Sequence, residues 1–409
     1  MTTVTPAQSQ GMIPGRHPAH PRKVPPGIRM VSRALLLPEP TDAEFRRFGE
    51  LLTVGDEPMD QLVAWMHQSD TDARKALFRR ALAEGIARVP EAPPALRDFF
   101  EDIETVPDWV DWDAIRLGGQ VMRSGGADGL AVARDVSLMG GYLFSGFNQT
   151  LLRTGALEKG SNRRFAETSQ WALDVIAENA MRPGGVGFRS TLHVRFIHSL
   201  VRRHVSAMPD WDCAVYGLPI NQTDMAATLV GALIAPVATG VGLGIVSSPK
   251  EYAATAHLTR YVGAIMGVTD DFLPHSFRDS LRILFQTARA LSTPDETSTV
   301  LARPMANDPL QWHYRYLTGL RRQIARSQHL SIATTYLGRD AMRELGVPTA
   351  LPWYPAIRIP ANLVESAMAR LPGGRERAAR RGDRRQARFM RTMVDGEATI
   401  GHAAKHVQH

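Results

Sequence analysis

Two stretches decide the fold of this chain: Arg163-Arg164-Phe165-Ala166-Glu167-Thr168-Ser169-Gln170-Trp171-Ala172-Leu173 and Thr191-Leu192-His193-Val194-Arg195-Phe196-Ile197-His198-Ser199-Leu200-Val201-Arg202-Arg203. Both place apolar residues at the three- and four-residue spacing of an amphipathic helix. In each stretch, polar side chains share the apolar face: Arg164 and Thr168 in the first, His198 in the second. We therefore predict two helices that bury an imidazole opposite a buried Arg/Thr pair.

His198 has two interpretations. A single histidine on an apolar face is more often a hydrogen-bonded core residue than a metal ligand. Here, however, Arg195 and Arg202 flank it at minus three and plus four, on the same edge of the helix. Arginine suits the two propionates of haem b, and a neutral imidazole gives iron its proximal bond. The pattern therefore predicts His198 as the iron ligand, with Arg195 and Arg202 as cofactor-binding residues.

Arg164 also has two interpretations, because an unpaired buried guanidinium is strongly unfavourable. Glu167 lies three residues after Arg164 and four after Arg163, so a local ion pair within the helix is the simpler one. In the second interpretation, Arg164 and Thr168 face a haem and donate hydrogen bonds at a distal site for dioxygen.

The length and composition leave open one large domain with appendages or two lobes. The 409 residues are 44% hydrophobic and 22% charged, which is typical of a globular chain. No strand-like alternation or repeat is present. We predict an all-α fold with a proline-rich flexible arm at 1–40, a helical domain at 41–392 and a tail at 393–409. Within the domain we expect a capped helix after Thr41, a helix over Asp70–Arg88, and a helix that carries Asn148 within the apolar segment Leu138–Leu157.

The single cysteine, Cys213, excludes an internal disulfide framework and fits a reducing compartment. The first 26 residues contain no apolar run of signal-peptide type, so we expect a cytoplasmic location. From Met225 to Pro249 no side chain is charged, yet Pro236 and the glycines after it break a helix. We predict two buried helical pieces there and no membrane span.

The net charge of +7 leaves an acidic partner open. The carboxyl-terminal stretch Arg370–Arg391 is rich in arginine, a pattern seen in proteins that bind nucleic acid or anionic lipid. Phe389 is its only aromatic residue, which does not favour base stacking. We therefore expect no nucleic-acid partner, favour a helical arm that packs on the body, and leave peripheral membrane contact and the oligomeric state open.

Several motifs together resemble a known family. They are Arg164-x-x-Glu167-Thr168, the stretch Leu192-His193-Val194-Arg195 with His198, the stretch Gly217-Leu218-Pro219-Ile220-Asn221-Gln222-Thr223-Asp224-Met225, Pro352-Trp353-Tyr354-Pro355 and Pro372-Gly373-Gly374-Arg375. The set is similar to the bacterial and fungal oxygenases that include rubber oxygenase (latex-clearing protein) and the mycophenolic-acid-pathway side-chain oxygenase.

This resemblance implies a globin-like helical core around one b-type haem and oxidative cleavage of isoprenoid double bonds by dioxygen. It implies that His198 is the axial ligand and that Arg164 and Thr168 lie on the distal side. The chain departs from the rubber-cleaving members at two positions. Those members carry a lysine where this chain has Glu167, and a catalytic glutamate near the position of Asn148, whose amide cannot abstract a proton.

Three hypotheses follow. The first is a haem b oxygenase that uses dioxygen on a small apolar isoprenoid or lipid, with apolar residues near Phe144, Phe147 and Trp171 lining a substrate channel. The second is a haem protein with a peroxidase-like or oxygen-binding role and no carbon–carbon cleavage, which Asn148 favours. The third is a cofactor-free helical protein that binds a partner through its basic arm.

Overall fold

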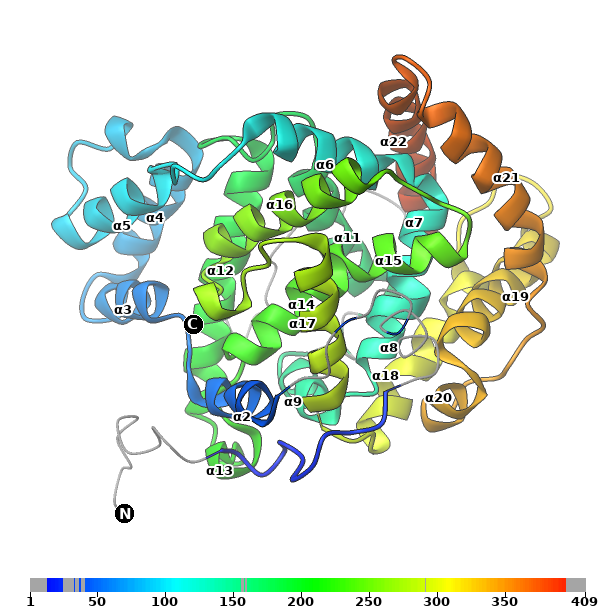
Figure 1. Cartoon of the computed structure of the whole chain (residues 1–409). Coiled ribbons are helices and arrows are strands. Elements are labelled where there is room, and N and C mark those ends of the chain that lie inside the picture. The colour runs from blue at the N-terminus through cyan, green and yellow to red at the C-terminus, as the bar shows by residue number, and fades with distance from the viewer. Residues whose placement is uncertain are drawn as a thin grey trace.

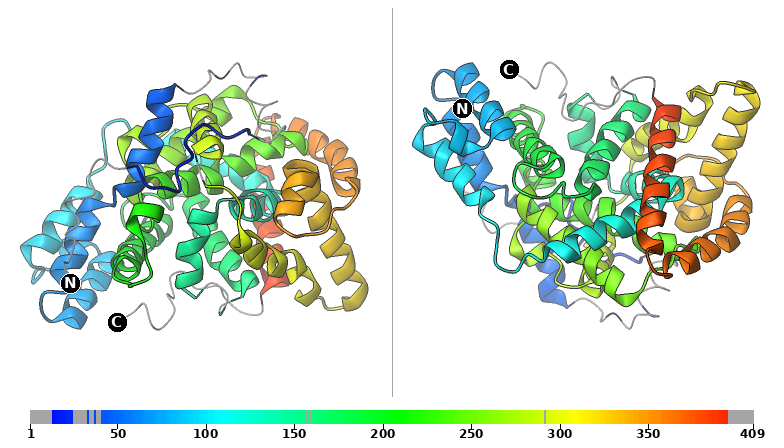
Figure 2. Two further views of the ribbon diagram at one scale, coloured as in Figure 1. Left: turned by 90° about the horizontal axis from the view of Figure 1, so that it is seen from below. Right: turned by 90° about the horizontal axis from the view of Figure 1, so that it is seen from above.

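The structure is a computed structural model that describes residues 13–24, 33, 37, 41–155, 158, 160–290 and 292–394. Every regular element within these ranges is a helix, so the prediction of a single all-α domain is confirmed. The chain runs from a lobe of short helices through a central bundle to a curved carboxyl-terminal layer on the opposite side (Figures 1 and 2).

The amino-terminal lobe and the first helix that leads out of it use residues 42–124. α6 crosses the molecule and contacts both the central bundle and the last helix. The elements of this part are α2 (Asp42–Glu50), η2 (Leu51–Thr53), α3 (Glu57–Met66), α4 (Thr71–Glu84), η3 (Ile86–Arg88), α5 (Pro94–Glu104) and α6 (Trp112–Ser124).

The central bundle holds the largest hydrophobic core, to which α3, α11, α12, α14 and α16 all contribute. One of its elements, η4, is a π-helix, a form that often marks functional sites. The elements of this part are α7 (Gly126–Val132), η4 (Ala133–Leu138), α8 (Met139–Gly141), α9 (Ser145–Arg153), α11 (Ser161–Ile176), α12 (Val186–Ser206), α13 (Cys213–Tyr216), α14 (Gln222–Leu233), α15 (Ala235–Gly242), α16 (Pro249–Met266), η5 (Asp270–Phe272) and α17 (Phe277–Ala290).

The carboxyl-terminal layer curves around one side of the bundle and ends in α22, which packs along α6 and α7 (Figure 2). The Arg-rich stretch is therefore a helical arm on the body, as expected. The elements of this part are α18 (Glu296–Asn307), η6 (Asp308–Gln311), α19 (Thr318–Leu337), α20 (Arg339–Glu344), α21 (Trp353–Ala369) and α22 (Gly374–Met393).

Local sequence signals account for several helix ends. Thr41 and Glu44 form the predicted capping box, in which each side chain accepts a hydrogen bond from the other residue's backbone N–H. The helix predicted over Asp70–Arg88 ends earlier, because Gly85 adopts a φ of +89° after Glu84. The segment Leu138–Leu157 is not one helix, since a turn at Tyr142–Phe144 separates α8 from α9.

Part of the predicted flexible arm lies against the body. The Gly15 N–H donates to the Ala214 carbonyl at 2.8 Å, and the Arg16 guanidinium forms a 2.7 Å ion pair with Asp224, with both side chains almost fully buried. The Arg22 backbone N–H donates to the Arg289 carbonyl at 3.0 Å. Residues 13–24 of the predicted arm therefore contact the body through hydrogen bonds and an ion pair. The remaining residues of the arm, apart from 33 and 37, lie outside the described residues, as does the predicted tail beyond residue 394.

The uncharged run forms two helices, as predicted. α14 ends at Leu233 and α15 begins at Ala235, with Pro236 in its first turn. By length and composition alone, Gln222–Gly242 is apolar enough to cross a membrane. Here α14 supplies buried side chains to the central core, so we interpret the run as core helices.

Two helix crossings depend on glycine. A Cβ atom at Gly118 of α6 would lie 2.4 Å from the Ala254 carbonyl oxygen of α16, and one at Gly382 of α22 would lie 1.8 Å from the Arg123 carbonyl oxygen of α6. The helix backbones can therefore approach closely only because these positions lack a side chain.

We expect Gly118→Ala to destabilise the protein by about 1–3 kcal/mol, since the added methyl group meets backbone atoms that cannot move alone. Gly129→Ala in α7 is the matched control, because no atom lies within 4 Å of the added carbon. It should be neutral or stabilise by up to about 1 kcal/mol through the better helix propensity of alanine. Urea unfolding measures both, and equal effects of the two variants would contradict the close crossing.

Candidate functional site

α11 and α12 run antiparallel, and side-chain contacts near their connection fix their register. The Trp171 indole N–H donates to the Thr191 hydroxyl at 3.2 Å, and the Ser190 hydroxyl donates to the Asp174 carboxylate at 2.5 Å. Trp171, Thr191, Val175 and Ile176 are all buried. The connected end of this helical hairpin is therefore closely packed.

The same register brings the predicted site residues to one level. Arg164 lies seven residues before Trp171, and His198 lies seven residues after Thr191. Seven residues make about two turns, so each residue stays on the face of its contact residue. Arg164 and His198 therefore lie opposite each other, two turns away from the packed end of the hairpin.

The His198 side chain has the properties of an unused ligand. Its ring is only partly accessible, and Nδ1 is fully buried without a hydrogen-bond partner. No hydrogen bond to either ring nitrogen is present within the described residues. Burial lowers the pKa of His198 to about 4, the positive charge of Arg202 acts in the same direction, and Asp56 opposes them. The imidazole is therefore neutral at pH 7, the form that binds a metal.

The distal residues differ from the prediction in burial. Arg164 is half-buried, but Thr168 is exposed, so the expectation of a buried Arg/Thr pair is wrong. Trp171 is buried, whereas Thr168, one turn earlier on the same helix, faces solvent. Glu167 pairs with Arg163 at 3.5 Å, and no described side chain pairs with the Arg164 guanidinium. The local ion pair of Glu167 thus forms with Arg163, and the Arg164 guanidinium can still donate hydrogen bonds.

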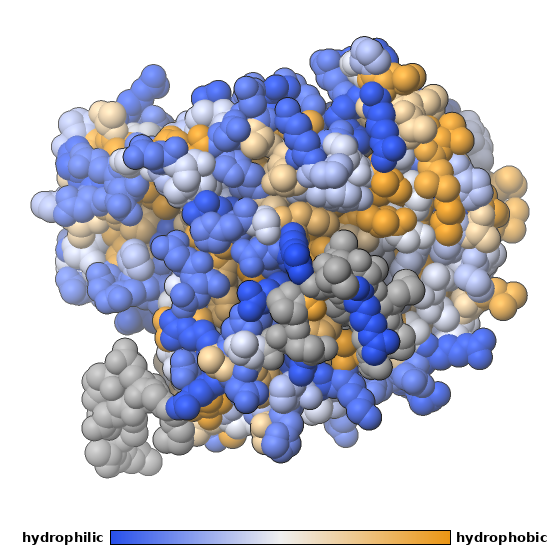
Figure 3. Space-filling model, in the orientation of Figure 1, coloured by the Kyte–Doolittle hydropathy of each residue, from blue (hydrophilic) through white to orange (hydrophobic). Residues whose placement is uncertain are grey.

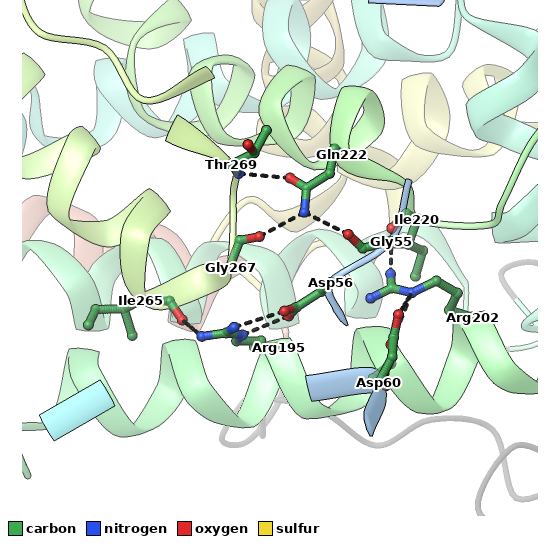
Figure 4. A network of polar contacts seen from close by, with 11 residues as sticks. Gly55, Asp56, Asp60, Arg195, Arg202, Ile220, Gln222, Ile265, Gly267 and Thr269 are labelled. Carbon is green, nitrogen blue, oxygen red and sulfur yellow. Dashed lines mark hydrogen bonds and ion pairs between the residues drawn. The ribbon is translucent and has the colours of Figure 1, made fainter. Parts of the chain in front are cut away.

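Arg195 and Arg202 contact protein carboxylates, which argues against the propionate role we predicted for them (Figure 4). Arg195 forms a bidentate pair with Asp56 at 2.6 and 2.8 Å. Arg202 pairs with Asp60 at 2.8 Å and also donates to the Ile220 carbonyl at 2.5 Å. Both guanidinium groups are buried and directed at α3 or the turn before it, so they tie α12 to that helix.

A further polar side chain completes this anchor. Gln222 at the start of α14 donates to the Gly55 and Gly267 carbonyls at 2.9 Å each and accepts from the Thr269 N–H at 2.9 Å (Figure 4). Gly267 has a φ of +81°, and a Cβ there would lie 2.5 Å from Asp56 Oδ2. The ends of α14 and α16 therefore close over the Asp56–Arg195 pair.

Asn148 lies in a structural contact of its own. It is fully buried on α9, and its amide donates to the Tyr142 carbonyl at 2.8 Å and to the Thr297 hydroxyl at 3.0 Å. Its Oδ1 atom is buried without a partner. The amide thus links α9 to α18 and to the turn before α9, and it leaves one acceptor free.

Sequence reasoning missed a buried ionic network at the start of α11. Arg134 and Asp135, both on the π-helix η4, pair with each other at 2.7 Å and are completely buried. His329 Nδ1 lies 2.5 Å from Asp135 Oδ2, and burial lowers the pKa of His329.

Asp308 joins Arg134 to α11. It lies 3.4 Å from the Arg134 guanidinium and accepts a 2.6 Å hydrogen bond from the Ser161 hydroxyl. Ser161 is the first residue of α11, three positions before Arg164. The network therefore holds the end of the helix that carries Arg164. The Ser161–Asp308 and His329–Asp135 contacts join residues that are 147 and 194 positions apart, so the only local signal was the adjacent charged pair Arg134-Asp135 in an apolar segment.

A cleft of about 710 Å³ opens elsewhere, between α6, the start of α16 and the turn into α22. Its charged lining residues are Arg116, Arg370, Arg375, Glu178, Glu251 and Glu376, so acids and bases balance. It shares no lining residue with α11 or α12, and we assign it no part in this site.

The geometry at His198 fits a cofactor that brings most of its own metal ligands. No group of three or more His, Cys, Asp or Glu side chains within the described ranges is arranged to hold a metal ion. An iron at His198 would therefore need its remaining ligands from a porphyrin. The imidazole with its unpartnered Nδ1 and the unpaired Arg164 fit such a group, whereas the paired Arg195 and Arg202 do not add to the fit.

Comparison with known proteins gives a family match. A family model described as the ER-bound oxygenase mpaB/B'/rubber oxygenase catalytic domain matches residues 126–371, more than half of the chain. The match includes α11 and α12 with Arg164 and His198, while Asp56 and Asp60 lie before it.

Two individual proteins are similar over large parts of the chain. The rubber oxygenase of Streptomyces sp. (strain K30) is 23% identical over 226 residues, which are 54% of this chain and 55% of that protein. The chain thus aligns with only about half the length of this relative. The structure of latex clearing protein in the closed state superposes with a TM-score of 0.63 at 18% identity, covering 86% of this chain and 93% of that one. At this identity the superposition shows a shared fold.

We expect Asp56→Ala to destabilise the protein by about 3–5 kcal/mol, because it leaves the buried Arg195 guanidinium without a counter-charge. Asp340→Ala is the control, since Asp340 pairs with Arg343 at 3.2 Å on the surface, and it should leave stability almost unchanged. Urea unfolding followed by circular dichroism compares the two. A small effect of Asp56→Ala would show that the pair does not anchor α12.

Proposed function

Because the chain belongs to the ER-bound oxygenase mpaB/B'/rubber oxygenase family, we propose that it is a haem b-dependent oxygenase that acts on an apolar, isoprenoid or lipid-like substrate with dioxygen. One observation carries the proposal: a neutral, unpaired imidazole at His198 lies at the same level of a helical hairpin as the unpaired guanidinium of Arg164. The name of the curated relative, a rubber oxygenase, supports oxygenase chemistry.

In this proposal His198 holds the iron. When bound, haem b supplies an iron centre that reacts with dioxygen. The ion pairs of Arg195 and Arg202 with α3 hold the backbone on both sides of His198, so the imidazole keeps its direction. This positioning role replaces direct contact of the two arginines with the cofactor.

On the opposite side, Arg164 and Thr168 present hydrogen-bond donors. A guanidinium without a carboxylate partner can donate to dioxygen or to an oxyanion that develops on the substrate. Glu167 is already paired with Arg163, so it does not neutralise Arg164. Ser161 and its bond to Asp308 fix the start of the helix that carries these donors.

The apolar surroundings favour an apolar substrate. Phe144 and Phe147 on either side of the α9 start are half-buried, so parts of both rings stay accessible. Trp171 is buried and hydrogen-bonded to Thr191 in the closely packed end of the hairpin. It therefore does not line an open substrate channel, in contrast to the expectation from the sequence. An apolar substrate that displaces water from Arg164 would strengthen the hydrogen bonds that its guanidinium donates.

Asn148 supports a second candidate function, a haem protein that binds oxygen or acts as a peroxidase without cleaving double bonds. Its amide is neutral and two of its hydrogen bonds tie helices together, so it does not provide a general base. Product analysis separates the candidates. Squalene incubated with the haem-loaded protein and dioxygen should give aldehyde or ketone fragments under the first proposal, and none under the second.

We further propose that the protein works in a reducing compartment such as the cytoplasm. Cys213 is an exposed free cysteine, and partial desolvation of its sulfur together with the charge of Asp212 raises the pKa of the thiol. In such a compartment, cellular reductants keep an exposed free thiol reduced.

We expect His198→Ala to abolish the intense visible absorption band of the haem-loaded protein or to shift it, because the variant lacks the nitrogen that would hold the iron. His193→Ala is the matched control on the same helix, five residues away, and it should keep the band of the unchanged protein. Optical spectra with and without dithionite make the comparison. An unchanged spectrum of His198→Ala would contradict the assigned ligand.

We expect Arg164→Gln to lower turnover roughly tenfold to a thousandfold while haem stays bound, because one charged donor to the developing oxyanion is lost. Arg203→Gln, in which an exposed arginine near the end of α12 is changed, should keep most of the activity. Oxygen consumption with squalene measures both variants. Equal turnover of the two would remove Arg164 from the proposed role.

A further inference from the structure

Exposed hydrophobic side chains concentrate in one part of this molecule. Of the fifteen large hydrophobic side chains that are exposed within the described residues, ten lie between Tyr316 and Leu371. Isolated exposed hydrophobic residues are normal, but a contiguous group marks an interaction surface. Figure 3 shows such residues gathered along the edge of the molecule where Figure 1 places α21.

α21 is amphipathic in the opposite sense to an ordinary surface helix. Its polar face is the one that packs on the body: the Asn362 amide donates to the Leu243 carbonyl and the Ser366 hydroxyl to the Gly244 carbonyl, both at 3.0 Å. Its apolar face points outward at three- and four-residue spacing, with Ile357 64%, Val364 60% and Leu371, just after the helix, 60% exposed. A surface helix that only packs on a core would bury this face.

The outward apolar face continues onto α19. The Trp353 indole N–H at the start of α21 donates to the Ser327 hydroxyl of α19 at 3.0 Å. One and two turns before Ser327, Ile324 and Leu320 are 48% and 59% exposed, and Leu317 at the tip is 73% exposed. Figures 1 and 2 place both helices on the same side of the molecule. We call these residues, with Ile357, Val364 and Leu371, the apolar edge.

The positive charge of the chain lies in the same region. Residues 313–393 contain sixteen arginines, no lysine and five acidic residues, an excess of eleven positive charges. The whole chain has an excess of seven, so the rest of the chain is net negative. The apolar edge therefore lies within a strongly basic segment, whose charge excess is larger than that of the whole chain.

α22 presents an arginine stripe beside the apolar edge. Its inward face is made of small and neutral side chains, while its solvent face carries exposed arginines at three- and four-residue spacing: Arg377, Arg380, Arg384, Arg388 and Arg391. Arg385 pairs with Glu365 of α21 at 2.7 Å, which holds the two helices side by side. No described acidic side chain pairs with Arg384 or Arg388.

We infer that the apolar edge and the arginine stripe form a docking surface for an anionic lipid bilayer. Exposed leucine, isoleucine and valine can enter the acyl boundary, while flanking arginines meet lipid phosphates. A second copy of the chain is disfavoured, because it would bring two arginine stripes together. Nucleic acid would use the arginines but would leave the aliphatic side chains in water. The inference does not depend on bound haem.

Co-sedimentation of the full-length protein with vesicles tests the inference. The wild-type protein should bind phosphatidylcholine vesicles that contain phosphatidylglycerol, and bind pure phosphatidylcholine vesicles at least tenfold more weakly. The triple variant Ile357→Gln/Val364→Gln/Leu371→Gln should lose roughly tenfold or more in affinity. Arg384→Gln/Arg388→Gln should weaken binding to anionic vesicles and reduce its dependence on salt.

Controls change the same residue types elsewhere. Val300→Gln, at a valine that is 42% exposed on α18, and Arg46→Gln, at an arginine on α2, should bind like the wild type. All substituted positions are exposed, and circular dichroism checks folding. Equal wild-type binding to both kinds of vesicle, or undiminished binding of the triple variant, would overturn the inference. So would sedimentation equilibrium showing a lipid-free dimer that the triple variant dissociates.

Discussion

The register of α11 against α12 is the constraint on which the candidate site depends. The Trp171–Thr191 and Ser190–Asp174 hydrogen bonds set that register at the connected end of the hairpin. Arg164 lies two turns before Trp171 on α11 and His198 lies two turns after Thr191 on α12, so in the antiparallel hairpin both residues lie at the same level. A slip of one residue would rotate either side chain by about 100° and remove it from the shared face. The site is thus a consequence of packing at some distance from it.

Buried charges hold the two helices in place from outside the hairpin. Arg195 and Arg202 attach α12 to the carboxylates of Asp56 and Asp60, and Asp308 attaches the start of α11 to Arg134. Buried ion pairs contribute little net stability, but removal of one partner is strongly destabilising. Such pairs therefore restrict each helix to one position. This restriction suits a site in which one imidazole and one guanidinium must keep their separation.

The sequence predicted the helices and helix ends that depend on local periodicity. It did not predict side-chain contacts with partners that are distant in the chain. The helices around Arg164 and His198, the capping box at Thr41 and the break at Pro236 follow from neighbours in the chain. The partners of Arg195 and Arg202 lie 139 and 142 residues away, so no pattern within α12 shows them. The exposure of Thr168 was also missed, since periodicity gives the face of a helix and not how far packing extends along it.

Haem stoichiometry of the purified full-length protein tests the central claim most directly. After expression with a haem precursor and iron, the pyridine haemochrome assay should find close to one haem b per chain. Repetition with His198→Ala and His193→Ala should show loss of haem in the first variant alone. A folded protein that retains no haem under these conditions, or that retains it equally well without the His198 imidazole, would contradict the account.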